Sequence, residues 1–268
     1  MRLAGLVDRP VPGRADDLGR RALIGNGRPG ALAGPRSRCV IITGMSAWVY
    51  NDRPDGVTFL PARITGEART EIEEEIWTWI VKGEDDPAEF VDYLEDDEER
   101  HGLTDEELTT AYERALAVRR DQQRSWGPVR SNLTQAFAEL NARGVLARED
   151  FSCCGTCASA EIHDERDDSR HWRGYVWYHT QDTDSLIADP NGSVYLGYGV
   201  YPPEDFDEDA YESLSDDEKR AAYQSDLEHL MDTVVFPVLQ DHGMRVVWNR
   251  DQAKRILVTG AQWYAPLD

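Results

Sequence analysis

Between Thr65 and Gly83, apolar residues recur every three or four positions, which places them on one face of a helix. Acidic residues gather at the start of this segment, where the helix dipole favours negative charge. Gly83 lies where a helix commonly ends, because glycine adopts the left-handed conformation of a C-cap without strain. The pattern therefore predicts a helix that ends at Gly83.

Capping signals and apolar periodicity predict three further helices in the first half of the chain. They begin at Asp86, at the Thr104–Glu107 capping box and near Leu133, and the last one ends at Gly144. We therefore interpret residues 45–126 as a helical region.

The pattern changes after Val145, where short runs rich in aromatic and β-branched residues predict strands. The predicted strands are Ala158–His163, Gly174–His179, Ser193–Val200, Arg245–Trp248 and Arg255–Thr259. A long helix is predicted from Ser215 to Gly243, and Pro237 is expected to kink it. We therefore expect an α+β fold: a helical N-terminal region followed by a small, mostly antiparallel sheet domain packed with helices, over residues 127–268.

Residues 1–44 differ in composition from the rest. They contain eight Arg and three Asp but no Lys or Glu, and they are rich in Gly and Pro. Such a segment buries too little apolar surface to offset its chain entropy, so we expect it to be disordered. We also hypothesise that this segment reflects a mis-assigned start codon and that translation begins at Met45.

The charge balance narrows the class of partners. The chain has 51 acidic and 29 basic residues, a net charge of −22. This field repels phosphate backbones and anionic lipid, so we expect neither nucleic acid nor a membrane as partner, whereas a basic protein or a metal cation is attracted. The sequence also lacks a secretory signal and an apolar run of about 18 residues, which predicts a cytoplasmic protein with reduced thiols.

Three of the four cysteines fall within five positions: Cys153, Cys154 and Cys157, with Cys39 far away. A Cys-x-x-Cys turn lets Cys154 and Cys157 face one cation, and zinc favours sulfur and imidazole ligands. A closed zinc site needs about four ligands, so we expect Cys153 or a histidine to complete it. The candidate histidines are His163, His171 and His179.

Two other interpretations of these cysteines stay open. A Cys-x-x-Cys turn can lower the pKa of one thiol and cycle through a disulfide. Thioredoxin-like folds place that motif after a strand and at the start of a helix, whereas here a helix is predicted before it and the strand Ala158–His163 after it. This context argues against thioredoxin-type exchange. The third interpretation is that the small thiols simply pack as apolar groups in a tight turn.

Polar residues follow the predicted strand Gly174–His179. His179 is followed by Gln181 and Asp182, and a histidine beside a carboxylate could be a metal ligand with its supporting partner or a general base. No nucleophile elbow and no phosphate-binding glycine-rich loop is present in the sequence. We therefore take Cys153, Cys154, Cys157 and His179 as the candidate metal ligands.

Several segments together resemble an actinobacterial family, the domain of unknown function numbered 6891. They are Phe151–Cys157, Ala160–Ile162, Gly174–His179, Gln181–Thr183 and Tyr195–Gly199, within a resemblance that covers about Pro128 to Trp263. The resemblance implies a bacterial intracellular protein. It implies no activity, cofactor or catalytic residue.

The leading hypothesis is a non-enzymatic binding or regulatory protein, with a zinc-stabilised turn at Cys153–Cys157 and an acidic surface for a basic partner. The alternative is a metal-assisted or thiol-based enzyme that uses Cys154 or Cys157 with His179 and Asp182. The position of His179 relative to the sulfurs distinguishes these hypotheses.

Overall fold

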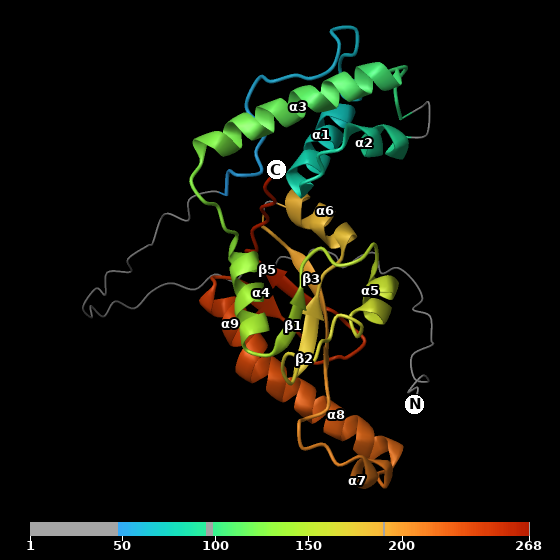
Figure 1. Cartoon of the computed structure of the whole chain (residues 1–268), viewed down its shortest axis with the longest axis vertical. Helices are drawn as coiled ribbons and strands as arrows, with labels where there is room; N and C mark the ends of the chain where they lie inside the picture. The colour runs from blue at the N-terminus through green and yellow to red at the C-terminus, as the bar shows by residue number, and fades with distance from the viewer. Residues whose placement is uncertain (1–47, 95–98, 190, 268) are drawn as a thin grey trace, which may run out of the picture. The chain divides into compact units, whose positions relative to one another are not determined.

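A computed structural model describes residues 48–94, 99–189 and 191–267 (Figure 1). The predictions for residues 1–44, the proposed start at Met45 and the state of Cys39 lie outside the described residues. The described chain from Trp48 onward forms one compact unit.

The helical region begins with three helices that pack side by side (Figure 1). They are α1 (Glu67–Lys82), α2 (Pro87–Tyr93) and α3 (Asp105–Ser125). Each predicted cap is confirmed. Gly83 ends α1 in the left-handed conformation, with φ 103°, and the Asp86 carboxylate accepts a hydrogen bond from the N–H of Ala88 at 2.8 Å. Thr104 and Glu107 form the capping box of α3.

A single apolar core includes residues from both predicted regions, among them Ile76, Leu108 and Leu196. The C-terminal segment contributes to it: the Trp263 indole N–H donates to the carbonyl of Val81 in α1 at 3.0 Å. The boundary between a helical region and an α+β domain at residue 126 therefore stays a prediction. The apolar core extends across this boundary.

The sheet has five strands in the order β1-β2-β3-β5-β4. They are β1 (Val145–Arg148), β2 (Gly174–Trp177), β3 (Val194–Val200), β4 (Arg245–Val247) and β5 (Ile256–Thr259). The pair β1 and β2 is parallel, and the other three pairs are antiparallel. The predicted α+β class with a mostly antiparallel sheet is confirmed.

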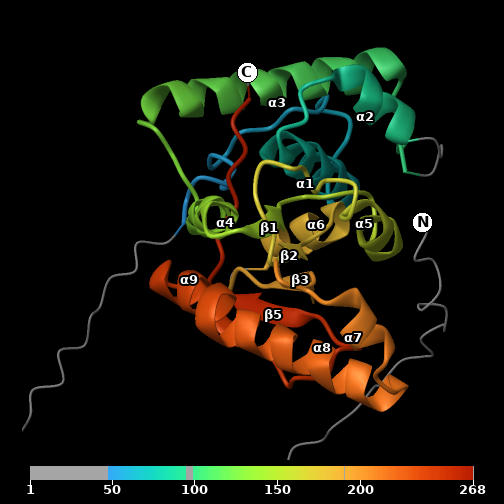
Figure 2. The ribbon, with the colours of Figure 1, turned by 60° about the horizontal axis from the view of Figure 1, so that its bottom comes forward.

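The two faces of the sheet pack against different helices. Buried residues of one face, such as Val176 and Leu196, join the main core with α4 (Asn132–Ala142) and the C-terminal helices, which lie along one side of the sheet in Figure 2. Residues of the other face, Leu146 and Trp177, form a smaller apolar cluster with α5 (Gly155–Glu161). The cysteines are therefore carried by the short helix that covers this second face.

The C-terminal helix is interrupted as the proline predicts. It consists of α8 (Asp216–Leu230), a π-helical turn at Met231–Val235 and α9 (Phe236–Asp241), with Pro237 in the first turn of the last segment. Proline has no N–H to donate within a helix, so the change in hydrogen bonding falls just before it. The short helix α7 (Glu208–Glu212) precedes these segments.

One predicted element is wrong and three observed elements were not predicted. Ala158–His163 is not a strand, since Gly155–Glu161 forms α5. The elements that were not predicted are β1, which directly follows Gly144, α6 (Thr180–Ala188), which begins soon after β2, and the short helix α7. All of these errors concern short elements, whose type is decided by tertiary packing more than by periodicity. None of the described helices is long and apolar enough to cross a membrane.

Gly197 allows a large ring to lie flat on β3. Trp177 in β2 is its cross-strand partner, and a Cβ atom built on Gly197 would lie 2.3 Å from Cζ2 of that indole. The indole is therefore in direct contact with the β3 backbone. The ring in turn lies close to Gly155 at the start of α5.

We predict that Gly197→Ala lowers the free energy of unfolding by about 1–3 kcal/mol, because the added methyl group overpacks the sheet against Trp177. Gly127→Ala is the matched control, since a Cβ there meets nothing within 4 Å. Urea unfolding of both variants measures the difference. Equal stability of the two variants would contradict the proposed packing role of Gly197.

Candidate metal centre

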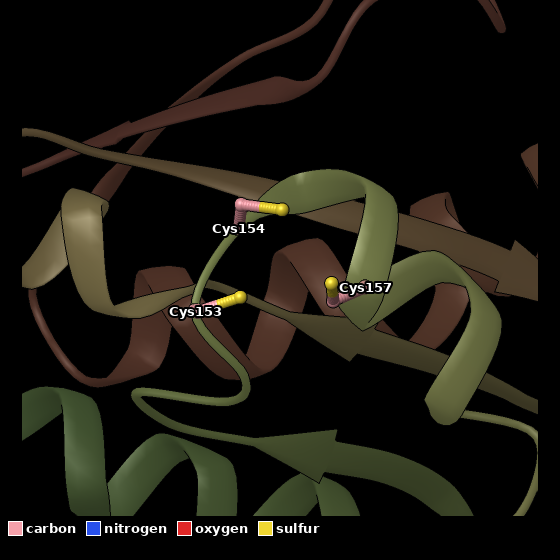
Figure 3. A group of neighbouring side chains, drawn as sticks. All are labelled: Cys153, Cys154 and Cys157. Carbon is pink, nitrogen blue, oxygen red and sulfur yellow. The ribbon is translucent and has the colours of Figure 1, made fainter.

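Three thiols meet at the start of α5. The sulfur atoms of Cys153, Cys154 and Cys157 all lie within 4.8 Å of one another, and Figure 3 shows them turned toward a shared space. Cys153 is exposed, whereas Cys154 and Cys157 are half-buried. Cys154 occupies the N-cap position of α5, and its carbonyl accepts the N–H of Ala158 at 2.9 Å. One turn of chain thus supplies all three sulfurs.

The loop before the cysteines is held in an unusual backbone conformation. Asp150 and Ser152 have φ values of 47° and 65°, in the left-handed region that non-glycine residues rarely adopt. Such residues persist where the surrounding structure compensates for their strain. The Ser152 carbonyl accepts hydrogen bonds from the N–H and the hydroxyl of Thr180, at 3.2 and 3.1 Å.

The other contacts of this loop also come from the end of β2 and the start of α6. The N–H of Phe151 donates to the Tyr178 carbonyl at 2.8 Å, and the Thr183 hydroxyl donates to the Asp150 carboxylate. Thr183 is fully buried. The segment that follows β2 therefore fixes the loop that presents the cysteines.

The thiols differ in acidity. The backbone N–H of Cys157, and then that of Thr156, favour the thiolate of Cys154 and lower its pKa below the usual value. The pKa of Cys157 is raised to about 11, because its thiol interacts with the sulfurs of Cys153 and then Cys154 and is disfavoured as a further negative charge. Cys154 is thus the first of this pair to ionise.

His179 and Asp182 lie beneath the turn and are both buried. The Asp182 carboxylate lies 3.2 Å from Nδ1 of His179, while Nη1 of Arg255 lies 3.1 Å from Nε2. An arginine can only donate, so Nε2 is the acceptor in that contact. Nδ1 meets both the carboxylate of Asp182 and its backbone N–H, which donates to Nδ1 at 3.3 Å. Both ring nitrogens of His179 are therefore occupied.

The structure places the other predicted polar residues differently. Gln181 is exposed on α6. His163 is exposed and contacts the rings of Tyr175 and Tyr201, with centroids 5.3 and 5.9 Å away, and His171 lines a separate cavity. Neither His163 nor His171 belongs to the group of ligand atoms that contains the three sulfurs.

Within the described ranges, the three cysteines are the only group of three or more His, Cys, Asp or Glu side chains placed to hold one metal ion. His179 is outside this set but adjacent to the turn, because a Cβ on Gly155 would lie 3.7 Å from its Nε2. A role of His179 as fourth ligand stays a prediction.

Arg255 is the residue of this site that the sequence did not indicate. It stands just before β5 and reaches across β3, where it contacts Asp182 and the carbonyl of Tyr195. No local motif marks it, since its partners are separated from it by 60 or more residues. A contact of this kind becomes visible only when the strand order is known.

The cysteines lie between a strand and a helix, contrary to the prediction from the sequence. The strand β1 precedes the cysteines and α5 follows them, with Cys154 at the helix N-cap. This is the strand-turn-helix order that the sequence interpretation found missing. The predicted context is thus corrected, and thiol chemistry regains support from the lowered pKa of Cys154.

A family model described as Domain of unknown function (DUF6891) matches residues 65–265. The match extends the resemblance found in the second half of the chain to the helices from α1 onward. No curated protein matches the chain, and no solved structure matches it.

We predict that iodoacetamide alkylates Cys154 faster than Cys157 between pH 7 and 9, because the thiolate is the nucleophile and the pKa of Cys154 is lowered. The rate at Cys154 should level off at lower pH than that of an ordinary cysteine, while that of Cys157 keeps rising toward pH 11. Peptide mapping by mass spectrometry measures each site. Faster labelling of Cys157 would contradict the assigned order.

Proposed function

The chain belongs to the DUF6891 family, a domain family of unknown function, and from its cysteine geometry we propose that it is a zinc-binding protein. The observation that carries this proposal is the convergence of three sulfurs within 4.8 Å. Zinc–sulfur bonds of about 2.3 Å in a tetrahedron place the sulfurs about 3.8 Å apart, and the separations within 4.8 Å in this turn are of that order.

The chemistry of the turn supports a soft or borderline cation. Thiolate sulfur selects ions such as zinc over the hard cations that prefer oxygen. Binding requires deprotonated cysteines, and Cys154 ionises more readily than an ordinary thiol. The net charge of −22 adds a general attraction for cations. We place the protein in the cytoplasm, because a thiolate site needs a reducing compartment.

We propose a binding or regulatory role rather than an enzymatic one. Cavities of about 580, 270 and 200 Å³ are formed near Arg63, Arg173 and Tyr93, and none of them is lined by a cysteine of the turn. His179, the candidate general base, has both nitrogens engaged. The acidic surface is then available to a basic protein, whose association the negative field accelerates.

The alternative is a thiol-based enzyme that uses Cys154 and Cys157. One observation favours it: Cys154 has a lowered pKa and Cys157 a raised one, at the start of a helix that follows a strand. In that case the two thiols would reduce a disulfide substrate, form an intramolecular disulfide and release two thiols. Such a protein would cycle between dithiol and disulfide without bound metal.

We predict that the protein purified under reducing conditions contains about one zinc ion per chain, since three thiolates in one turn form most of a four-ligand site. Elemental analysis measures the content. The double variant Cys154→Ser, Cys157→Ser should lose the ion, and Cys39→Ser, far away in sequence, is the matched control.

Zinc removal by a chelator should also lower the melting temperature of the wild type but not that of the double variant. Absence of stoichiometric metal in the wild type would contradict the zinc proposal. A reversible Cys154–Cys157 disulfide in a metal-free protein would favour the enzyme alternative instead.

A further inference from the structure

The guanidinium of Arg255 stands at the one ring nitrogen of His179 that could bind a metal. Its Nη1 lies 3.1 Å from Nε2, and its Nη2 contacts Asp182 and the carbonyl of Tyr195. The same group lies over the Trp177 ring, 5.4 Å from the ring centre. A cation is therefore already bound at the position that a metal ion at His179 would take.

The other side of the imidazole is arranged as in a metal-binding histidine. Such a histidine commonly donates its second N–H to a carboxylate, which fixes the tautomer and leaves the remaining nitrogen for the ion. Here Nδ1 lies 3.2 Å from the Asp182 carboxylate and also accepts the backbone N–H of Asp182 at 3.3 Å. Arg255 can only donate, so its contact with Nε2 uses the lone pair that would coordinate an ion.

Arg255 is not fully satisfied where it lies. Its side chain is 32% exposed, so a path to solvent is open, and its Nε is buried without a hydrogen-bond partner. A buried donor without a partner costs about 1–3 kcal/mol. Turning the guanidinium outward would remove this cost and so offset part of the loss of its other contacts.

The cysteine turn is next to the same nitrogen. A Cβ on Gly155 would lie 3.6 Å from Cδ2 and 3.7 Å from Nε2 of His179, which is ordinary van der Waals contact. Yet Nε2 does not belong to the set of ligand atoms within 4.8 Å. A shift of the ring or of the turn is therefore required before nitrogen and sulfur can share an ion.

We propose, on the premise that the cysteine turn holds zinc, that His179 is the fourth zinc ligand. Arg255 occupies Nε2 of His179 as long as no ion is bound. The single lone pair of Nε2 accepts either the guanidinium N–H or the ion, so the two cations exclude each other. When the ion is bound by Cys153, Cys154 and Cys157, His179 completes the site and Arg255 turns outward from Trp177 and Tyr195. Occupancy of the site is thereby coupled to the exposure of the buried Trp177 ring, over which the guanidinium lies.

The test uses the full chain loaded with cadmium-113, a zinc substitute with a nuclear spin, and labelled with nitrogen-15 in histidine. We expect a scalar coupling between the cadmium and Nε2 of His179, absent in His179→Ala. Arg255→Ala should bind zinc about tenfold more tightly than the wild type, because the competing cation is gone. Arg245→Ala, on the exposed strand β4, is the matched control and should leave the affinity unchanged.

Failure of this inference is distinguishable from failure of the zinc proposal. A cadmium ion that is bound by cysteines but shows no coupling to His179, with unchanged affinity in Arg255→Ala, would overturn the inference and leave the zinc proposal standing. Loss of affinity in Arg255→Ala would also overturn it, since the guanidinium would then support the ion. Absence of any metal at the cysteines would overturn both. Arg255→Gln replaces Arg255→Ala if the latter does not fold, and the cadmium measurement on the wild type needs neither variant.

Discussion

The cysteine turn depends on the hydrogen bonds between the loop before it and the segment that follows β2. The bonds from Thr180 to Ser152 and from Thr183 to Asp150 help to compensate for the strain of two left-handed residues, together with the bond from Phe151 to Tyr178. β2 ends at Trp177, and His179 is the N-cap of α6, where its side chain accepts the N–H of Asp182 and the chain leads into the residues that hold the loop. The polar segment after β2 is therefore part of the cysteine site even where it touches no sulfur.

The aromatic side chains between the sheet and α5 determine how far the cysteine turn lies from the sheet. Trp177 lies on Gly197, and Gly155 lies against the rings of Trp177 and His179. A glycine in β3 and a glycine at the start of α5 thus let one indole fill the space between strand and helix. This layer is what brings the turn, His179 and Arg255 to the same place, although they are distant in sequence.

Local signals predicted the parts of the fold that local energetics decide. The caps at Gly83 and Thr104 and the interruption at Pro237 follow from backbone chemistry within a few residues, and the structure has each of them. The segment Ala158–His163 was mistaken for a strand because the helical character of this part of the chain comes from packing Ala158 and Ile162 on the sheet. The cysteines were found by spacing alone. Arg255 could not be found, since its partners come from β3 and α6.

The Asp182 carboxylate is buried, so both the observed arrangement with Arg255 and the proposed ion-bound arrangement have to supply it with a positive charge. Most ion pairs of the described chain have at least one exposed partner and contribute little, whereas Asp182 is buried and would be costly to leave without a cation. Arg255 supplies that cation directly. In the proposed ion-bound arrangement this positive charge leaves when Arg255 turns outward, so the ion at Nε2 of His179 has to replace it from the other side of the ring.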